Sequence, residues 1–146
     1  MMKPLTTLEI DEIMMHHPNY LGCYAADEIP RRLKRPCTII VNTDPIGQPG
    51  THWIGLLLKK NKAFYFDSFG LPLIQIDILN YLKKYYKYVI YNKKCIQHVN
   101  SLTCGLYCIA FAQNVNNEKM YRKFLNSFSS NHPKVNDNIV IQFISK

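Results

Sequence analysis

Runs of aliphatic and aromatic residues, separated by short polar stretches, predict strands in the middle of the chain. Residues 37–42 (CTIIVN) form one such run and are apolar enough for a buried strand. Residues 52–58 (HWIGLLL) and 63–69 (AFYFDSF) are rich in strand-forming types, and residues 59–62 (KKNK) between them predict a hairpin loop. Residues 88–92 (YVIYN) predict a further strand. The pattern therefore indicates a sheet that contains a β-hairpin.

The chain opens with the pattern of an N-terminal helix. Thr6 is followed three residues later by Glu9, which is the spacing of a capping box at the start of a helix. The apolar residues that follow fit one face of that helix. We expect this face to bury Ile10, Ile13 and Met14.

Further helical patterns lie in the second half of the chain. Residues 73–86 and 118–128 carry apolar positions at helical spacing, and residues 104–114 (CGLYCIAFAQN) read as a buried helix. Residues 138–144 fit a strand as well as a short helix. The expected buried faces are Leu79, Leu82 and Tyr86, and then Met120, Phe124 and Phe128. Mixed elements of this kind predict an α+β fold in a single domain, 1–146, with a mixed central sheet flanked by helices.

The composition is that of a globular protein, with 47% hydrophobic and 19% charged residues. No apolar run approaches the ~20 residues that a membrane-spanning helix needs. Residues 1–15 carry acidic side chains within their apolar part, so they do not resemble a signal peptide. The five cysteines are an odd number, which favours free thiols in a reducing, intracellular compartment and not a secreted protein.

The chain is basic, with a formal net charge of +8. Lysine and arginine cluster in four segments, 31–35, 59–62, 83–87 and 93–94. Such clusters can form a surface that meets DNA or another polyanion. Solvated faces that keep the protein soluble explain them equally well. The charge alone identifies no partner.

One cysteine lies where a thiol can be reactive. Cys104 is preceded by a polar stretch and followed by the apolar residues 105–112, so we expect it at or near the N-terminus of a helix. A helix N-terminus and a nearby imidazole both stabilise a thiolate. A buried core thiol is the commoner role for a lone cysteine beside an apolar run. Other polar residues have to decide between the two.

A histidine and an aspartate form a candidate pair. His52 follows a loop rich in Gly and Pro and begins a predicted strand, where an imidazole can face a cleft. If residues 59–62 are the hairpin loop, Ile54 lies opposite Asp67, so His52 and Asp67 are diagonal neighbours on one face. A carboxylate there can orient the imidazole and stabilise its protonated form. A turn-capping role for Asp67 is the alternative.

A glutamine completes the set. Acyl transfer to a thiol needs hydrogen-bond donors for the developing oxyanion. Gln97, seven residues before Cys104, is the best side-chain candidate, and the backbone N–H of Cys104 is another. On its own, a glutamine in a polar loop is usually just solvated.

The ordered set resembles the adenain-like cysteine peptidases, the adenovirus protease family, which is related to the ubiquitin-like-protein-specific proteases. Three blocks carry the resemblance: residues 40–53 (IVNTDPIGQPGTHW), 64–70 (FYFDSFG) and 96–108 (IQHVNSLTCGLYC). The spacing of seven from Gln to Cys also matches. Two departures are visible. Asp67 stands where the adenovirus enzymes commonly have glutamate, and the chain is shorter after Cys104.

The resemblance implies an adenain/papain-like core with Cys104 as nucleophile, His52 as base, Asp67 as orienting acid and Gln97 as oxyanion donor. It implies a cysteine endopeptidase that matures viral or virus-like capsid or core precursors at glycine-containing sites. The chemistry needs no cofactor, although relatives use DNA and a small peptide as activators, and the basic clusters would suit DNA. The implied setting is a monomer without membrane contact, in the host cytoplasm or nucleus and in the virion.

Two alternatives stay open. A protease that deconjugates ubiquitin-like proteins would use the same mechanism. A small zinc-dependent nucleic-acid-binding module is the alternative from a different class, because four soft ligands follow the spacing C-x2-H-x5-C-x3-C. Those ligands would be Cys95, His98, Cys104 and Cys108. The module leaves the histidine, aspartate and glutamine of the peptidase pattern without a role.

Overall fold

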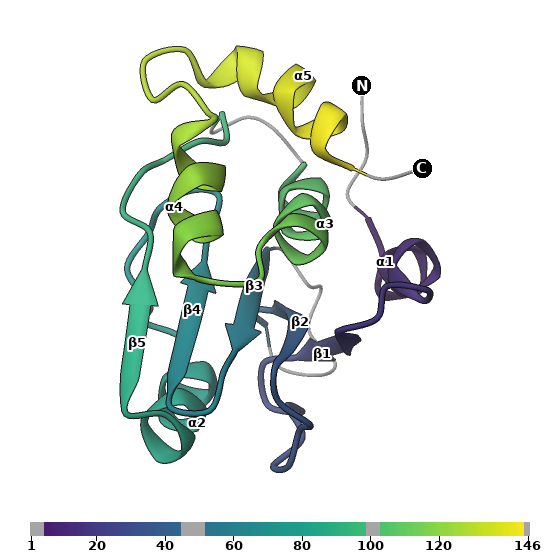
Figure 1. The fold of residues 1–146 in the computed structure, drawn as a ribbon, viewed down its shortest axis with the longest axis vertical. Coiled ribbons are helices and arrows are strands. Elements are labelled where there is room, and N and C mark those ends of the chain that lie inside the picture. The colour runs from purple at the N-terminus through teal and green to yellow at the C-terminus, as the bar shows by residue number, and fades with distance from the viewer. Residues whose placement is uncertain (1–4, 45–51, 99–102, 145–146) are drawn as a thin grey trace.

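The computed structural model describes residues 5–44, 52–98 and 103–144, which form a five-stranded sheet with helices on both faces (Figure 1). The strands are β1 (Tyr20–Ala25), β2 (Cys37–Asn42), β3 (Trp53–Leu58), β4 (Lys62–Phe66) and β5 (Tyr88–Tyr91). The helices are α1 (Thr7–Met14), α2 (Ile76–Tyr85), α3 (Cys104–Asn114), α4 (Glu118–Asn126) and α5 (Pro133–Phe143). The predicted α+β fold with a mixed sheet is confirmed.

The strands lie in the sheet in the order of the chain, β1-β2-β3-β4-β5. The two outer pairs, β1 with β2 and β4 with β5, are parallel, whereas β2 with β3 and β3 with β4 are antiparallel. A parallel pair needs a crossover connection, and α2 lies in the one between β4 and β5. The central strands β2 and β3 are buried along their whole length. Burial on both faces explains why they read as unbroken apolar runs.

The two faces of the sheet pack into separate cores. Alternate side chains of β4 enter different cores, so Phe64 and Phe66 pack with α3, whereas Tyr65 packs with α2. The ring of Phe66 stacks on Phe111 of α3 at 5.0 Å between centroids. A Cβ on Gly55 of β3 would lie 2.7 Å from the Phe111 ring, so the glycine lets α3 approach the sheet closely. This close packing fixes the position of α3 and of its first residue.

The N-terminal helix forms as predicted, with one difference in its buried face. The backbone N–H of Glu9 donates to Oγ1 of Thr6, and the N–H of Thr6 donates to Oε1 of Glu9, which is a complete capping box. Ile10 and Met14 are fully buried, but Ile13 is 43% exposed. The prediction for Ile13 was wrong because the face that packs on the core is narrow and Ile13 lies at its border.

Of the six residues predicted to be buried in the two helical segments 73–86 and 118–128, four are buried, namely Leu82, Tyr86, Phe124 and Phe128, and one in each segment is not. On the α2 side Ile78 is buried with Leu82 and Tyr86, whereas Leu79 is only half-buried. On α4 Tyr121 is buried with Phe124, whereas Met120 is half-buried. In both cases the apolar residues extend around the helix far enough to allow two alternative buried faces, and packing against the core selects one of them.

The ends of the chain supply the remaining differences. The ambiguous residues 138–144 belong mostly to helix α5, which has Pro133 in its first turn, a favoured place for proline. Strand β1 is absent from the predicted elements. It is only partly buried and contains Gly22, so its sequence lacks the apolar alternation of a typical strand. The loop rich in Gly and Pro that is predicted before His52 spans residues 43–51, and most of it lies outside the described residues.

Candidate active site

Cys104 is the first residue of α3, at the position that the sequence predicts for the start of this helix. Its side chain lies at the edge of the α3 core and keeps 7% exposure. The first turn of a helix presents unpaired backbone N–H groups and a partial positive charge. The fold therefore places the buried sulfur of Cys104 at a helix N-terminus, where negative charge is stabilised.

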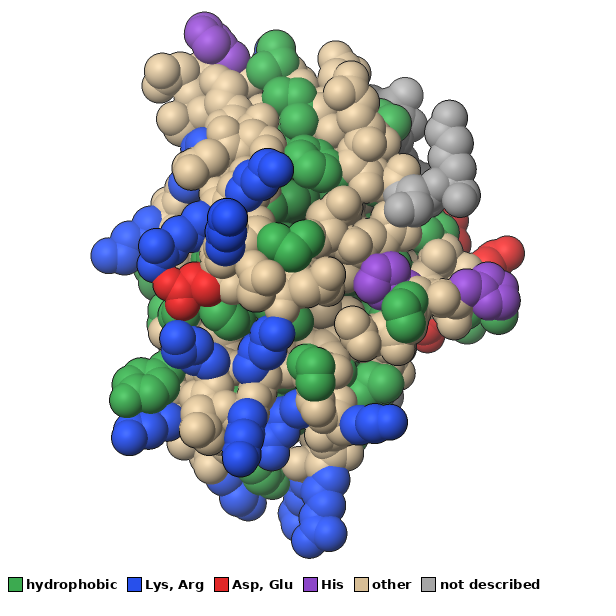
Figure 2. Space-filling view, viewed as in Figure 1, with side chains coloured by type: hydrophobic (Ala, Val, Ile, Leu, Met, Phe, Trp, Pro, Cys, Tyr) green, Lys and Arg blue, Asp and Glu red, His purple; other side chains and the backbone are tan. Residues whose placement is uncertain are grey.

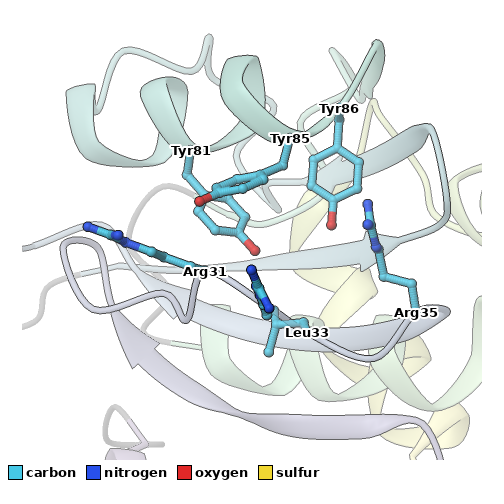
Figure 3. A pocket seen from close by; sticks show the side chains of 7 residues that line it. Arg31, Leu33, Arg35, Tyr81, Tyr85 and Tyr86 are labelled. Atoms are coloured by element: carbon cyan, nitrogen blue, oxygen red, sulfur yellow. The ribbon is translucent and has the colours of Figure 1, made fainter.

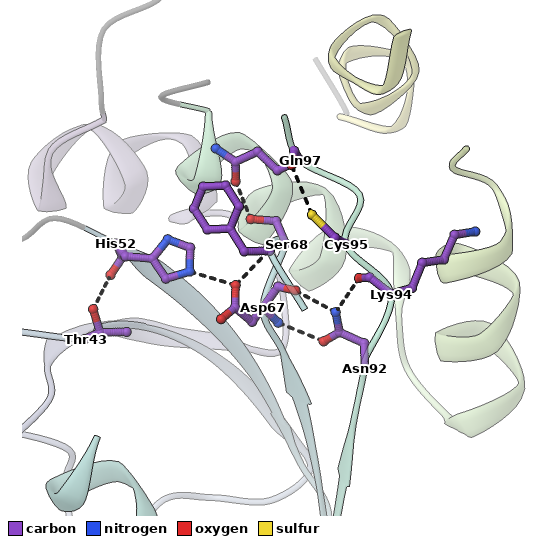
Figure 4. A network of polar contacts seen from close by, with 9 residues as sticks. Thr43, His52, Asp67, Ser68, Asn92, Lys94, Cys95 and Gln97 are labelled. Carbon is purple, nitrogen blue, oxygen red and sulfur yellow. Dashed lines mark hydrogen bonds and ion pairs between the residues drawn. The ribbon is translucent and has the colours of Figure 1, made fainter. Parts of the chain in front are cut away.

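His52 and Asp67 meet at the open end of the β3–β4 hairpin. The register pairs Leu58 with Ala63 and Gly55 with Phe66, so the chain enters β3 and leaves β4 at the same end. His52 precedes β3 and Asp67 follows β4, and His52 Nε2 lies 2.8 Å from Asp67 Oδ1 (Figure 4). The juxtaposition expected from a diagonal pair is present in the structure.

Asp67 is held from several directions. It is 4% exposed, and its Oδ1 also accepts the backbone N–H of Phe69 at 2.8 Å. Its own backbone is clamped by the side chain of Asn92, as Figure 4 shows. The N–H of Asp67 donates to Asn92 Oδ1 at 2.8 Å, and Asn92 Nδ2 donates to the carbonyl of Asp67 at 2.5 Å and to that of Lys94 at 3.3 Å. The carboxylate thus has a fixed place beside the imidazole.

The surroundings of His52 favour its protonated form. Burial lowers the pKa of the imidazole, but the hydrogen bonds to Asp67 and Cys104, together with their charges, outweigh burial and raise the pKa to about 9. Nε2 contacts Asp67, so the contact with the Cys104 thiol falls to Nδ1, which is buried and has no other hydrogen-bond partner among the described residues. The ring also stacks on Phe69 at 4.9 Å between centroids. At neutral pH the site can hold an imidazolium beside Cys104.

Gln97 is buried, with 1% exposure, although it lies in a segment that reads as a polar loop. The hydroxyl of Ser68 donates to Gln97 Oε1. Ser68 also accepts the backbone N–H groups of Ile96 and Gln97 through its carbonyl, at 2.9 and 3.0 Å. Because Ser68 follows Asp67 directly, Gln97 belongs to the same polar network as the His52–Asp67 pair (Figure 4).

Two members of this network are absent from the candidates that the sequence gives. Asn92 and Ser68 are 5% and 0% exposed, and each makes several of the hydrogen bonds above. A weak signal exists in the sequence. Asn92 ends the apolar run of β5, and Ser68 interrupts an aromatic stretch, so both are polar residues at positions where burial is expected.

The remaining cysteines lie in different surroundings. All five thiols are free. Burial raises the pKa of Cys37 to about 11 and that of Cys23 to about 12, and it raises that of the fully buried Cys108 well above the ordinary value. Cys95 is exposed, and its thiol donates to the carbonyl of Gln97 at 3.3 Å. These thiols fit core or surface roles.

The structure lends no support to the zinc alternative. Within residues 5–44, 52–98 and 103–144, no group of three or more His, Cys, Asp or Glu side chains is arranged to hold a metal ion. Cys108 lies inside the α3 core while Cys95 is exposed, so the ligands of the zinc alternative lie in different surroundings.

Among the helices of the same described residues, none is long and apolar enough to span a membrane.

Solved structures that resemble the chain include crystal structures of the ASFV protease. One matches with a TM-score of 0.47 and 18% identity, covering 99% of this chain and 62% of that one. A second, the selenomethionine form, matches with a TM-score of 0.45 and 18% identity, covering 90% and 61%.

Sequence comparison gives a closer likeness. The chain is 33% identical over 95 residues to the protease of bovine adenovirus 7, which is 51% of this chain and 44% of the relative. The chain thus spans less than half the length of this curated relative. The model of the adenovirus endoprotease family matches residues 20–142, which include His52, Asp67, Gln97 and Cys104. By this match over most of its length, the chain belongs to the adenovirus endoprotease family.

Proposed function

We propose that the protein is a cysteine endopeptidase with Cys104 as nucleophile, His52 as general base and acid, and Asp67 as the orienting carboxylate. One observation carries the proposal. His52 is bonded through Nε2 to the buried Asp67, its other nitrogen is left for Cys104, and its pKa is raised to about 9. An imidazolium beside a sulfur at a helix N-terminus is the arrangement that generates a thiolate at neutral pH.

The proposed reaction follows from this geometry. The Cys104 thiolate attacks the scissile carbonyl carbon, and the oxyanion that forms accepts hydrogen bonds from the N–H of Cys104 and from Nε2 of Gln97. The tetrahedral intermediate collapses, the C–N bond breaks, and the imidazolium of His52 protonates the leaving amine. His52, now neutral, takes a proton from water, whose oxygen attacks the thioester, and the thiolate is released as the acid product leaves.

The proposed substrates are viral or virus-like structural precursors that are cleaved at glycine-containing sites. Membership of the adenovirus endoprotease family and the likeness to an adenovirus protease support this choice. A protease for ubiquitin-like conjugates remains the second candidate, because its chemistry would be the same. We propose that the chain acts as a monomer inside the host cell and the virion, where its five free thiols would stay reduced.

We further propose that DNA contacts the basic side of the molecule. Figure 2 shows lysine and arginine side chains gathered over the left side and the lower part of the view. A cavity of about 380 Å³ brings arginines together with tyrosines, as Figure 3 shows. Its lining is Arg31, Arg32, Leu33, Arg35, Tyr81, Tyr85 and Tyr86. Guanidinium groups beside aromatic rings suit phosphates and bases, so binding should weaken steeply with salt.

The first test is alkylation of the native protein with a substoichiometric reagent, followed by peptide mapping. We expect preferential modification of Cys104 at neutral pH in the wild type, and loss of that preference in His52→Ala. His132→Ala is the matched control, because His132 is an exposed histidine at the start of α5. Equal labelling of several cysteines, or unchanged labelling in His52→Ala, would contradict the proposal.

A second experiment separates the two substrate classes. The wild type is incubated with glycine-containing peptides and, separately, with a ubiquitin-like protein that carries a C-terminal extension. We expect the wild type to cleave the peptides and to leave the extended ubiquitin-like protein intact. Cleavage of the extension alone would favour the deconjugating protease.

A further inference from the structure

Ser68 holds Gln97 at both its main chain and its side chain. The carbonyl of Ser68 accepts the N–H of Gln97 at 3.0 Å, and the hydroxyl of Ser68 donates to Gln97 Oε1. Both residues are buried, at 0% and 1% exposure. Water therefore does not compete for this contact, and the hydroxyl decides where the carboxamide oxygen lies.

A carboxamide has an acceptor at one end and a donor at the other. Rotation about the last torsion of glutamine is broad and roughly two-fold, so packing alone distinguishes the two ends poorly. Once Oε1 accepts the Ser68 hydroxyl, Nε2 must point to the other side, and Figure 4 shows the nitrogen directed away from Ser68. An oxyanion needs the nitrogen end, because only that end carries N–H groups.

We propose that Ser68 is a positioning residue that orients the carboxamide of Gln97 so that Nε2 is presented to the oxyanion. The inference rests on the proposed function, since it names a partner of the proposed oxyanion donor. Ser68 itself touches neither the substrate nor Cys104 in this role. Because Ser68 follows Asp67 directly, one dipeptide sets the imidazole through Asp67 and the oxyanion donor through Ser68.

The inference is tested with Ser68→Ala, which removes the hydroxyl and keeps the carbonyl that anchors the main chain of Gln97. Loss of an oxyanion donor lowers kcat by about 10²–10³, and a misdirected donor should cost part of that, so we expect a fall of roughly 10–100-fold with KM unchanged. The rate of Cys104 alkylation by iodoacetamide should stay at the wild-type value, because that displacement forms no oxyanion.

Two further variants give the test its specificity. In a Gln97→Ala background, Ser68→Ala should cause no additional loss, because both changes act on one group. Ser127→Ala is the matched control, since the Ser127 hydroxyl also donates one hydrogen bond, to the carbonyl of Lys123, but on the exposed surface of α4. The control should keep kcat, KM and the alkylation rate of the wild type.

The outcomes decide the inference separately from the proposed function. The role of Ser68 would be overturned if Ser68→Ala kept the wild-type kcat, or if its loss added to that of Gln97→Ala. It would also be overturned if the nitrogen of the Gln97 carboxamide were found to face Ser68. If the wild type cleaves no peptide, the proposed function fails. The side-chain amide resonances of Gln97 in ¹⁵N-labelled protein, assigned with Gln97→Ala, then decide the contact. These resonances should shift in Ser68→Ala. Resonances identical to those of the wild type would refute the contact between Ser68 and Gln97.

Discussion

Cys104 and Cys108 lie one turn apart on the same helix, at the edge and in the interior of the same core. Cys104 begins α3, keeps some exposure and contributes to the raised pKa of His52. Cys108 is fully buried in the α3 core, and burial raises the pKa of its thiol well above the ordinary value. The same side chain on the same helix thus lies beside an imidazole in one turn and inside the apolar core, with a raised thiol pKa, in the next.

The difference comes from what the sheet presents to each turn. Cys104 lies beside the end of the β3–β4 hairpin, where the polar side chains of His52 and Asp67 gather. Cys108 belongs to the core that α3 forms with aromatic side chains such as Phe66. A strand end can collect polar groups without burying unpaired ones, whereas the middle of the sheet cannot. The two thiols of α3 therefore differ in their neighbours because they lie at different positions along the helix.

Replacing each cysteine by alanine should give the largest contrast. Cys104→Ala removes the proposed nucleophile, so we expect peptide cleavage to fall by about 10⁴-fold or more, with folding retained. Cys108→Ala should keep activity per folded molecule. Cleavage rates and circular dichroism of both variants check this. Substantial activity in Cys104→Ala would show that Cys104 is not the nucleophile, and the contrast with Cys108 would then be wrong.

Asp67→Asn tests the link between the carboxylate and the imidazole through pH. In the wild type the pKa of His52 is about 9, so the imidazolium persists as pH rises to that value and is lost above it. We therefore expect kcat/KM to decline above about pH 9. In Asp67→Asn the carboxylate no longer offsets burial, so the pKa of His52 falls and the decline moves to lower pH. The rate at the optimum should drop by about 10²–10⁴-fold.

The pH–rate profile has a control with a distinct outcome. Asp77→Asn changes a carboxylate in the first turn of α2, outside the polar network of the site, and should leave the position of the decline unchanged. A decline at the same pH in Asp67→Asn and wild type would mean that another group limits the reaction. That result would remove Asp67 from the proposed mechanism.

Asn92→Ala should have a smaller effect, through the position of Asp67. The variant leaves the buried N–H and C=O of Asp67 without the partners they have at 2.8 and 2.5 Å. We expect a loss of about 1–3 kcal/mol in the free energy of unfolding. A displaced carboxylate should also lower kcat by roughly 10–100-fold. Denaturant unfolding and steady-state kinetics measure the two effects, with the exposed Asn80→Ala on α2 as control. Wild-type kcat in Asn92→Ala would show that the clamp is dispensable.

The proximity of His52 and Asp67 could be predicted from the sequence because the length of a hairpin loop fixes which residues of the two strands pair. Once residues 59–62 are the turn, pairing of Leu58 with Ala63 follows, and so does the meeting of the two flanking residues. The start of α3 at Cys104 was also predictable, since polarity changes sharply there. Local pattern fixes relations of this kind.

Asn92 and Ser68 could not be predicted in the same way. Asn92 lies 25 residues from Asp67, and its contact depends on the parallel pairing of β5 with β4, which needs the α2 crossover. Ser68 reaches Gln97 across 29 residues for the same reason. Strand β1 was missed because its pattern is weak. Choices between neighbouring apolar residues, such as Leu79 and Ile78, depend on packing that one sequence does not state.

Cys108→Ser sharpens the comparison from the buried side and should have the smallest effect on activity. The hydroxyl that replaces the thiol enters an apolar core, which costs about 1–3 kcal/mol of unfolding free energy unless it finds an acceptor on the preceding turn. Activity per folded molecule should match the wild type, because Cys108 has no proposed part in the reaction. Thermal unfolding and active-site titration of Cys104 measure the two quantities. Loss of activity with stability unchanged would mean that the second turn of α3 takes part in the site, and the contrast between the two thiols would then be wrong.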